Sequence, residues 1–360
     1  MDHLDIRILR QLSQAHTVWP AKPGLVSSYR GIARQLGASP GTVRNRIRGM
    51  VRTGFLREMQ VYVNPTVLGL SSGSYAVEVP PDRSKAGVID RLGQVEGVVF
   101  FENFHGTLLG IGLTYPDDHG LQRTLAQIDG IVGSTGVFSR VEHPPSSASL
   151  APSEWTLVAR LMRGRFLTYP QLARENGLSV RTLKRRLARL VAVGAILTFP
   201  RMDYRALLGG VTADLLVSYG DAGARPETRS RILRRVEEWL IFAGVWEDFE
   251  VYRLILPNVP LATHLAEEVG RMEEVRLVRA ELVDGVADHF DGLRSRVEQR
   301  AAAGRDLGPP WPRKERARTG VRDSARPMGD GPRTRREPGS PAPRALSAGS
   351  ARPRRGRSRS

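Results

Sequence analysis

The sequence predicts an α+β fold in which two winged helix-turn-helix domains alternate with two ferredoxin-like βαββαβ domains, followed by a disordered basic tail. Two observations support this prediction. Residues 29–56 return at 169–196, a constant shift of 140 positions, with nine of 28 positions identical, so an internal repeat sets the architecture. After each copy, the hydrophobic period changes from that of short helices to a mixture of strands and helices.

Composition restricts the classes of protein that this chain can be. The 360 residues carry a net charge of +17 and no Cys, which excludes disulfides, thiolate metal sites and Cys nucleophiles. No apolar run approaches the roughly 18 residues that a membrane helix needs. Residues 1–10 begin an amphipathic helix rather than a signal peptide. We therefore expect a cytoplasmic, nucleoid-associated protein that has no membrane partner.

The first helix-turn-helix domain is expected at residues 1–65. Its first helix carries an apolar stripe at helical spacing, formed by Leu4, Ile8, Leu9 and Leu12. Gly37 ends a second helix, because glycine adopts the left-handed conformation of helix ends without steric cost. Ser39 then caps a third helix, and a proline in the first turn suits that start. Residues 55–65 alternate enough to form a short two-stranded wing.

The other domains follow from the same patterns. Residues 70–145 read β-α-β-β-α-β, which is typical of an antiparallel sheet with helices on one face. The second half repeats the plan, with a second winged helix-turn-helix domain at 152–204 and a second ferredoxin-like domain at 208–287. Within the sandwich domains, Phe101–Asn103 matches Trp246–Asp248 with a shift of 145, which indicates loops of different length.

The last segment, residues 300–360, concentrates the positive charge. Residues 301–360 hold 16 Lys or Arg against five Asp or Glu, together with nine Pro and eight Gly. Such a segment buries too little apolar surface to offset the entropy of ordering it, so we expect disorder. The tail would add salt-dependent, sequence-independent affinity for DNA, or it would be a solvated tail with little effect.

The third helix of each repeat is the candidate DNA-reading element. A helix-turn-helix places this helix in the major groove with its first residues on base edges. There Arg can pair with guanine and Asn with adenine, each worth roughly 1–3 kcal/mol of discrimination. The residues expected to face DNA are Ser39, Pro40, Gly41, Thr42, Arg44, Asn45 and Arg48 in the first copy, and Arg181, Thr182, Lys184 and Arg185 in the second. The alternative is that they form the solvated faces of ordinary helices.

Arg46 and Arg186 are the arginine that the two copies share in this helix. Both lie one helical turn further in than the first base-reading positions. We therefore expect them to bind phosphate or support the helix rather than read bases. The second copy is less regular, since Asn176 replaces the apolar Leu36.

The segments LDIRILRQL (residues 4–12) and IARQLGASPGTVRNRIRGMVRTGFL (residues 32–56), with the sandwich domain that follows, resemble the Lrp/AsnC (leucine-responsive, feast/famine) transcription regulators. The resemblance covers residues 1–143 and, more loosely, 153–285. It implies winged helix-turn-helix domains joined to effector-binding, oligomerising sandwich domains. The partners it implies are double-stranded DNA, a small-molecule effector and, through the sandwich domains, a homo-oligomer. Because family members usually carry one such pair per chain, two pairs suggest a fused pseudo-dimer.

The sequence departs from the family where the sandwich usually has a Gly followed by an acidic residue, a feature associated with amino-acid effectors. Here Gly106 is followed by Thr107, and the second copy reads Glu250–Arg253 without a Gly. This departure puts an amino-acid effector in doubt. Asp117 and Asp118 provide an alternative anchor or a solvated loop.

Enzyme signatures are missing from the sequence. The seven His are scattered, and no metal-ligand spacing, nucleophile motif or phosphate-cradling loop is present. We therefore predict a sequence-specific regulator that is not an enzyme and has no catalytic residue, cofactor or metal. Two alternatives remain: a non-specific architectural DNA-binding protein, and a tetrapyrrole enzyme, since sirohaem decarboxylases resemble paired Lrp-like units. The second would use groups in Asn103–His105 and Tyr252–Arg253.

Overall fold

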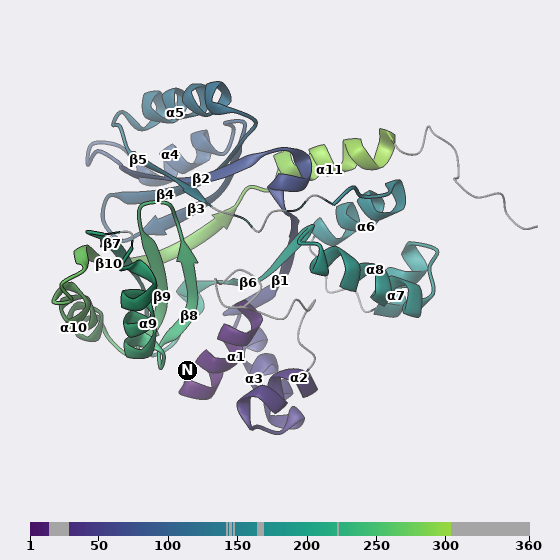
Figure 1. Cartoon of the computed structure of the whole chain (residues 1–360), viewed down its shortest axis with the longest axis horizontal. Coiled ribbons are helices and arrows are strands. Elements are labelled where there is room, and N and C mark those ends of the chain that lie inside the picture. Colours follow the sequence, from purple (N-terminus) through teal and green to yellow (C-terminus); the bar gives the residue numbers. More distant parts are fainter. Residues whose placement is uncertain are drawn as a thin grey trace, which may run out of the picture. The chain divides into compact units, whose positions relative to one another are not determined.

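The computed structural model of the chain describes residues 1–13, 29–141, 143, 146, 148–163, 169–221 and 223–303 (Figure 1). The chain is α+β, as predicted. From position 304 onward, the predicted basic tail lies outside the described residues.

The first half contributes the following elements in chain order: α1 (His3–Ser13), α2 (Tyr29–Leu36), α3 (Pro40–Arg52), β1 (Leu56–Val63), the 3-10 helix η1 (Pro65–Leu68), β2 (Ser71–Glu78), α4 (Lys85–Leu92), β3 (Val98–Phe104), β4 (Leu108–Tyr115), α5 (Asp118–Val132) and β5 (Val137–Val141).

The second half contributes α6 (Pro152–Met162), α7 (Tyr169–Glu175), α8 (Val180–Ala192), β6 (Ile196–Met202), the 3-10 helix η2 (Tyr204–Ala206), β7 (Val211–Tyr219), α9 (Arg225–Val236), β8 (Leu240–Val245), β9 (Glu250–Leu256), α10 (Val259–Gly270), β10 (Val275–Asp288) and α11 (Asp291–Ala303).

Each half brings four strands to an eight-stranded sheet. The strand order is β5-β2-β4-β3-β10-β7-β9-β8, so within each half the fourth strand lies beside the first, then the third, then the second. Helices α4 and α5 bury their apolar faces on one side of the first four strands, and α9 and α10 do the same on the second four (Figure 1). This arrangement is the ferredoxin-like order that the β-α-β-β-α-β pattern predicts.

The strands that follow the third helices correct one prediction. Each repeat was expected to form its own two-stranded wing, but β1 and β6 instead pair with each other, antiparallel, in a two-stranded sheet. Met59 pairs with Pro200 and Gln60 with Phe199. The 140-residue repeat makes Met59 equivalent to Phe199 and Gln60 to Pro200, so the pairing is reciprocal. Reciprocal pairing of equivalent segments is the mark of a two-fold axis.

The two halves of the large sheet also meet in a two-fold manner. β3, the second sandwich strand of the first half, pairs antiparallel with β10, the fourth of the second half. The corresponding opposite edges meet in a single bridge between Val141, at the end of β5, and Trp246, just after β8. Two edges that would otherwise be exposed are therefore joined within one chain.

The pairing corrects the predicted match between Phe101–Asn103 and Trp246–Asp248. Phe100 lies opposite Gly112, and Phe242 lies opposite Arg253 at the corresponding place in the second half. Phe242 is thus the counterpart of Phe100, a shift of 142 rather than 145. The sequence match was misleading because Trp246–Asp248 lies three residues beyond the segment of the second half that pairs as Phe101–Asn103 does.

Helix α11 is an element that the sequence analysis missed, and it moves the start of the predicted tail beyond residue 300. Its buried residues Leu293, Val297 and Ala301 join the core of α6, α7 and α8. Within the described residues, α11 contacts α6, β1 and β3. By contrast, α1 packs directly on β8, where Arg10 Nε donates to the backbone oxygen of Leu240 at 2.8 Å.

Candidate nucleic-acid interface

The same local chemistry starts both candidate DNA-reading helices. Gly37 and Gly177 have φ values of 66° and 62°, a conformation that glycine adopts more readily than other residues. Two residues later, the Ser39 side chain accepts a hydrogen bond from the Thr42 backbone N–H at 3.0 Å. Ser179 accepts from Thr182 in the same way at 3.1 Å. The first turn of each helix is therefore fixed by its own cap.

On α3, an apolar face turns inward and a polar face turns outward. Val43 and Met50 are buried in the first helix-turn-helix core. Arg44, Asn45 and Arg48 are exposed. The other predicted contact residues lie at the start of the helix, where Ser39 and Pro40 are exposed and Gly41 and Thr42 are half-buried. The predicted contact residues of the helix thus present two guanidinium groups and one amide to solvent.

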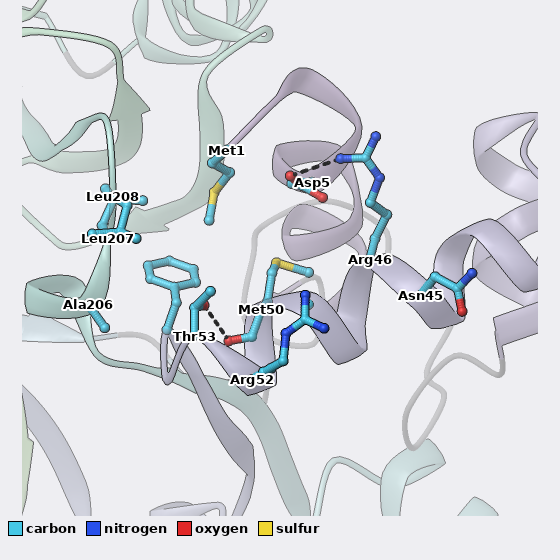
Figure 2. Close-up of a pocket in the computed structure, with 12 residues that line it drawn as sticks. Met1, Asp5, Asn45, Arg46, Met50, Arg52, Thr53, Ala206, Leu207 and Leu208 are labelled. Atoms are coloured by element: carbon cyan, nitrogen blue, oxygen red, sulfur yellow. Dashed lines mark hydrogen bonds and ion pairs between the residues drawn. The ribbon is translucent and has the colours of Figure 1, made fainter.

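Arg46 is bound to the first helix of its own unit. Its Nη1 lies 2.6 Å from Asp2 Oδ2 and 3.4 Å from Asp5 Oδ2, and Figure 2 shows the side chain reaching from α3 toward Asp5 on α1. Burial disfavours the Asp2 charge, but the Asp5 backbone N–H and the Arg46 guanidinium together lower the pKa of Asp2. Burial raises the pKa of Asp5. Of the two roles expected for Arg46, the contacts favour support of the helix.

The second candidate helix presents a different set of groups. Arg181, Lys184 and Arg185 are exposed, and Thr182 is half-buried at the cap. Lys184 Nζ lies 5.1 Å from the centre of the Tyr169 ring, a distance at which a cation is attracted to an aromatic face. Ala188, the counterpart of Arg48, is exposed and offers only a methyl group at this position of the outward face.

The repeat predicts that Arg186, the counterpart of Arg46, supports α8, but a different arginine of this helix is paired with α6. Glu154 on α6 is the counterpart of Asp5, because each accepts a hydrogen bond from the backbone N–H three residues earlier. Glu154 is paired with Arg189, one turn beyond Arg186. Among the described residues, Arg186 forms no ion pair, and it lines a surface pocket with Glu154 and Arg189. Arg186 is therefore available to an anion in a way that Arg46 is not.

A second surface pocket lies beside α3, and residues of both halves of the chain line it. Asn45, Arg46, Met50 and Arg52 line it from α3, and the segment Ala206–Leu208, which follows β6, closes the other side (Figure 2). The first helix-turn-helix unit therefore rests against residues of the second half.

Sequence reasoning missed a buried charge cluster between the halves of the large sheet. The Arg253 guanidinium donates to both carboxylate oxygens of Asp214, at 2.8 Å and 2.6 Å. It also pairs with Glu102 from the first half and donates to the Tyr204 hydroxyl at 3.2 Å. Charged residues inside the apolar segments of β7 and β9 were the available signal, since such residues are buried only when they are paired.

The structure points two of the candidate tetrapyrrole-binding residues in opposite directions. Tyr252 and Arg253 are adjacent on β9, so they face opposite sides of the sheet. Tyr252 joins the core under α9 and α10. Asn103 Nδ2 donates to Asp284 at 2.7 Å, and His105 is exposed in the turn between β3 and β4. Tyr252, Arg253 and the Asn103 Nδ2 are hydrogen-bonded to neighbouring side chains, whereas the Asn103 Oδ1 is buried without a partner among the described residues.

The part of the chain that the structure describes holds no group of three or more His, Asp or Glu side chains arranged for a metal ion. No helix in those same residues has the length and apolar character required to cross a membrane.

Comparison with known proteins gives one match in sequence. No family model matches the chain. A helix-turn-helix transcriptional regulator of Methanocaldococcus jannaschii, Ptr1, is 35% identical over 69 residues, which are 19% of this chain and 40% of that protein. The chain thus spans about two fifths of the length of the curated relative that it matches.

Solved structures share the fold at low identity. The siroheme decarboxylase NirDL, in complex with an iron-uroporphyrin III analogue, is 14% identical, covers 82% of this chain and 98% of its own, and has a TM-score of 0.49. AsnC of E. coli is 20% identical, covers 42% of this chain and 97% of its own, and has a TM-score of 0.28. These likenesses concern the fold alone. The prediction that the chain is not an enzyme is corrected by this finding, since an enzyme is among the solved structures that it resembles.

Proposed function

We propose that the chain is a sequence-specific DNA-binding transcription regulator of the Lrp/AsnC type, and that one chain supplies both helix-turn-helix units. The observation that carries the proposal is the reciprocal pairing of β1 with β6. Helix α3 ends at Arg52 and β1 begins at Leu56, while α8 ends at Ala192 and β6 begins at Ile196. Each candidate reading helix is therefore tied by a short connection to the two-fold axis.

In this proposal the two kinds of domain have different roles. Residues 1–65 and 152–204 bind double-stranded DNA, and residues 70–145 and 208–287 hold the DNA-binding units at a fixed separation. That separation selects the spacing of half-sites. A ligand bound between the sandwich domains would change the spacing and thereby the affinity. The match to a helix-turn-helix regulator supports DNA as the partner.

Selection of bound duplexes from a random DNA pool, at near-physiological salt, tests the proposal. We expect enrichment of a motif with two half-sites. Arg44→Ala should weaken binding to that motif by about 1–3 kcal/mol and relax one base position. The matched control is Arg123→Ala, on the exposed face of α5, which should bind like the unmodified chain.

Two outcomes would contradict the proposal. Equal weakening on all sequences by Arg44→Ala would exclude base reading by that residue. An absence of enrichment, with binding that fades as salt rises, would indicate an architectural DNA-binding protein. In that case a change in the Soret band when an iron uroporphyrin is added would favour the tetrapyrrole enzyme.

A further inference from the structure

The two candidate reading helices are held as counterparts but do not carry the same side chains. The β1–β6 pairing relates α3 to α8 by the two-fold axis, and the two helices begin with the same Ser–Thr cap. Their backbones would therefore meet two half-sites in the same way. Differences between the half-sites that they prefer must come from the outward side chains.

The two helices share Thr42 and Thr182 at the cap, but the side chains further along their outward faces differ. Asn45 corresponds to Arg185, and all four residues of the pairs Asn45–Arg185 and Arg48–Ala188 are exposed. An Asn amide suits adenine, whereas an Arg guanidinium suits guanine. Arg48 can reach a base edge or a phosphate, but Ala188 offers only a methyl group.

The start of each helix adds a second difference. Gly41 has no side chain, whereas its counterpart Arg181 is an exposed cation. The exposed cations of α8 that form no ion pair within the described residues therefore lie in its first two turns, at Arg181, Lys184 and Arg185, since Arg189 is paired with Glu154. On α3 they lie at Arg44 and Arg48 and continue to Arg52. In a helix-turn-helix, the first residues of the reading helix contact base edges. The different placing of the cations on α3 and α8 therefore changes which bases each helix can read.

The arginine shared by the two copies differs in its surroundings as well. Arg46 is occupied by Asp2 and Asp5. At the position equivalent to Asp2 the second copy has Ala151, and Arg189 takes Glu154. Arg186 thus forms no ion pair within the described ranges and is free to contact a phosphate. The two units should divide base contacts and phosphate contacts differently.

We infer that the DNA site of this protein is asymmetric: two inverted half-sites of unlike sequence, read by α3 and α8 respectively, so that the chain binds in one orientation only. The half-site under α3 carries adenine where the half-site under α8 carries guanine, at the base read by Asn45 and Arg185. This inference rests on the proposed function, and it adds to it, since a homodimer with identical reading helices would favour a symmetric site.

Binding to three duplexes tests the asymmetry. The first is the selected site, and the other two are inverted repeats of its left half and of its right half. We expect the selected site to bind about 10- to 100-fold more tightly than either repeat. Asn45→Arg should reverse the order in favour of the repeat of the α8 half-site. Equal or tighter binding of either repeat by the unmodified chain would overturn the inference.

A directed cleavage experiment tests the orientation independently. The chain has no Cys, so Gln35→Cys, at an exposed position of α2, gives a single attachment point for an iron chelate that cleaves nearby DNA. Circular dichroism of the labelled variant first confirms that it is folded. We expect cleavage at one end of the selected duplex. Equal cleavage at both ends would overturn the inference, whereas a random pool that yields no motif would reject the proposed function itself, and the inference with it.

Discussion

At the scale of single residues, charged side chains in this protein divide between those that hold the fold and those that face solvent. Arg46 and Arg48 lie two positions apart on α3, yet of the two only Arg46 forms ion pairs, with Asp2 and Asp5. Sequence reasoning placed both in the candidate site, because a basic helix face gives no sign of which cations are already paired. Asp5 is one of the residues that pair with Arg46. Its place in α1 shows this only once α1 is packed against α3.

Arg46→Ala should lower the free energy of unfolding by about 1 kcal/mol, because the half-exposed pair with Asp2 and Asp5 is lost and the two carboxylates are left together. The affinity for DNA should fall by the same factor on every DNA sequence, because Arg46 holds the helix and reads no base. Urea unfolding and binding to several duplexes measure the two effects. The control, Arg48→Ala, should leave stability unchanged while it weakens DNA binding. A changed base preference in the Arg46 variant would contradict this account.

Arg253 and Asp214 present the opposite case, a fully buried pair. Arg253→Met should cost about 3–5 kcal/mol, because it leaves the Asp214 carboxyl buried without its partner. Burial raises the pKa of Asp214 well above its ordinary value of 3.8. In this variant the folded state would keep a proton that the unfolded state loses, so stability should fall as the pH rises above 3.8.

Adding Asp214→Leu to Arg253→Met provides the matched test. Removing both charged groups should recover part of the lost stability, since Glu102 still lacks its partner, and should remove the pH dependence that the buried Asp214 carboxyl adds, as measured by urea unfolding at several pH values. Two losses that simply add would show that the ion pair is not the source of the effect.

At the scale of elements, the sequence predicted the helices and strands whose positions depend on local signals such as periodicity and helix caps. The helices of both repeats, their caps and the β-α-β-β-α-β order follow from periodicity, Ser39, Ser179 and the glycines that end helices. The pairing of β1 with β6 and of β3 with β10 was missed, because strand pairing between distant segments leaves no local mark. Helix α11 was missed because its small apolar stripe is outnumbered by charged residues, although Leu293, Val297 and Ala301 do recur at a helical spacing.

Two glycines near the reading helix should respond in opposite ways to alanine. Gly37 has a φ of 66°, and no atom would touch an added Cβ, so Gly37→Ala should destabilise the chain by about 1 kcal/mol through the backbone alone. Gly49 lies inside α3 with the same free space. Gly49→Ala should therefore stabilise the helix by about 0.5–1 kcal/mol. Thermal unfolding of the two variants compares them, and shifts of the same sign would refute the assigned helix boundaries.

At the scale of the whole molecule, the chain joins within itself surfaces that would otherwise be exposed. The β1–β6 pair relates the halves by a two-fold axis, and the β3–β10 pair has its two-fold counterpart in the bridge between Val141 and Trp246. The repeat in the sequence indicated two copies, and only the register shows that they face each other. The asymmetry is equally informative: α1 packs on β8, whereas α11 lies against α6 and also contacts β3. Equivalent units in one chain can diverge, because each is encoded separately.

The most direct test of the central claim is the stoichiometry of the complex with a selected duplex just long enough for two half-sites, measured by native mass spectrometry. The account predicts one chain per duplex, with both half-sites protected from cleavage. Two chains per duplex, each protecting one half-site, would contradict it, because the internal two-fold would then play no part in recognising DNA.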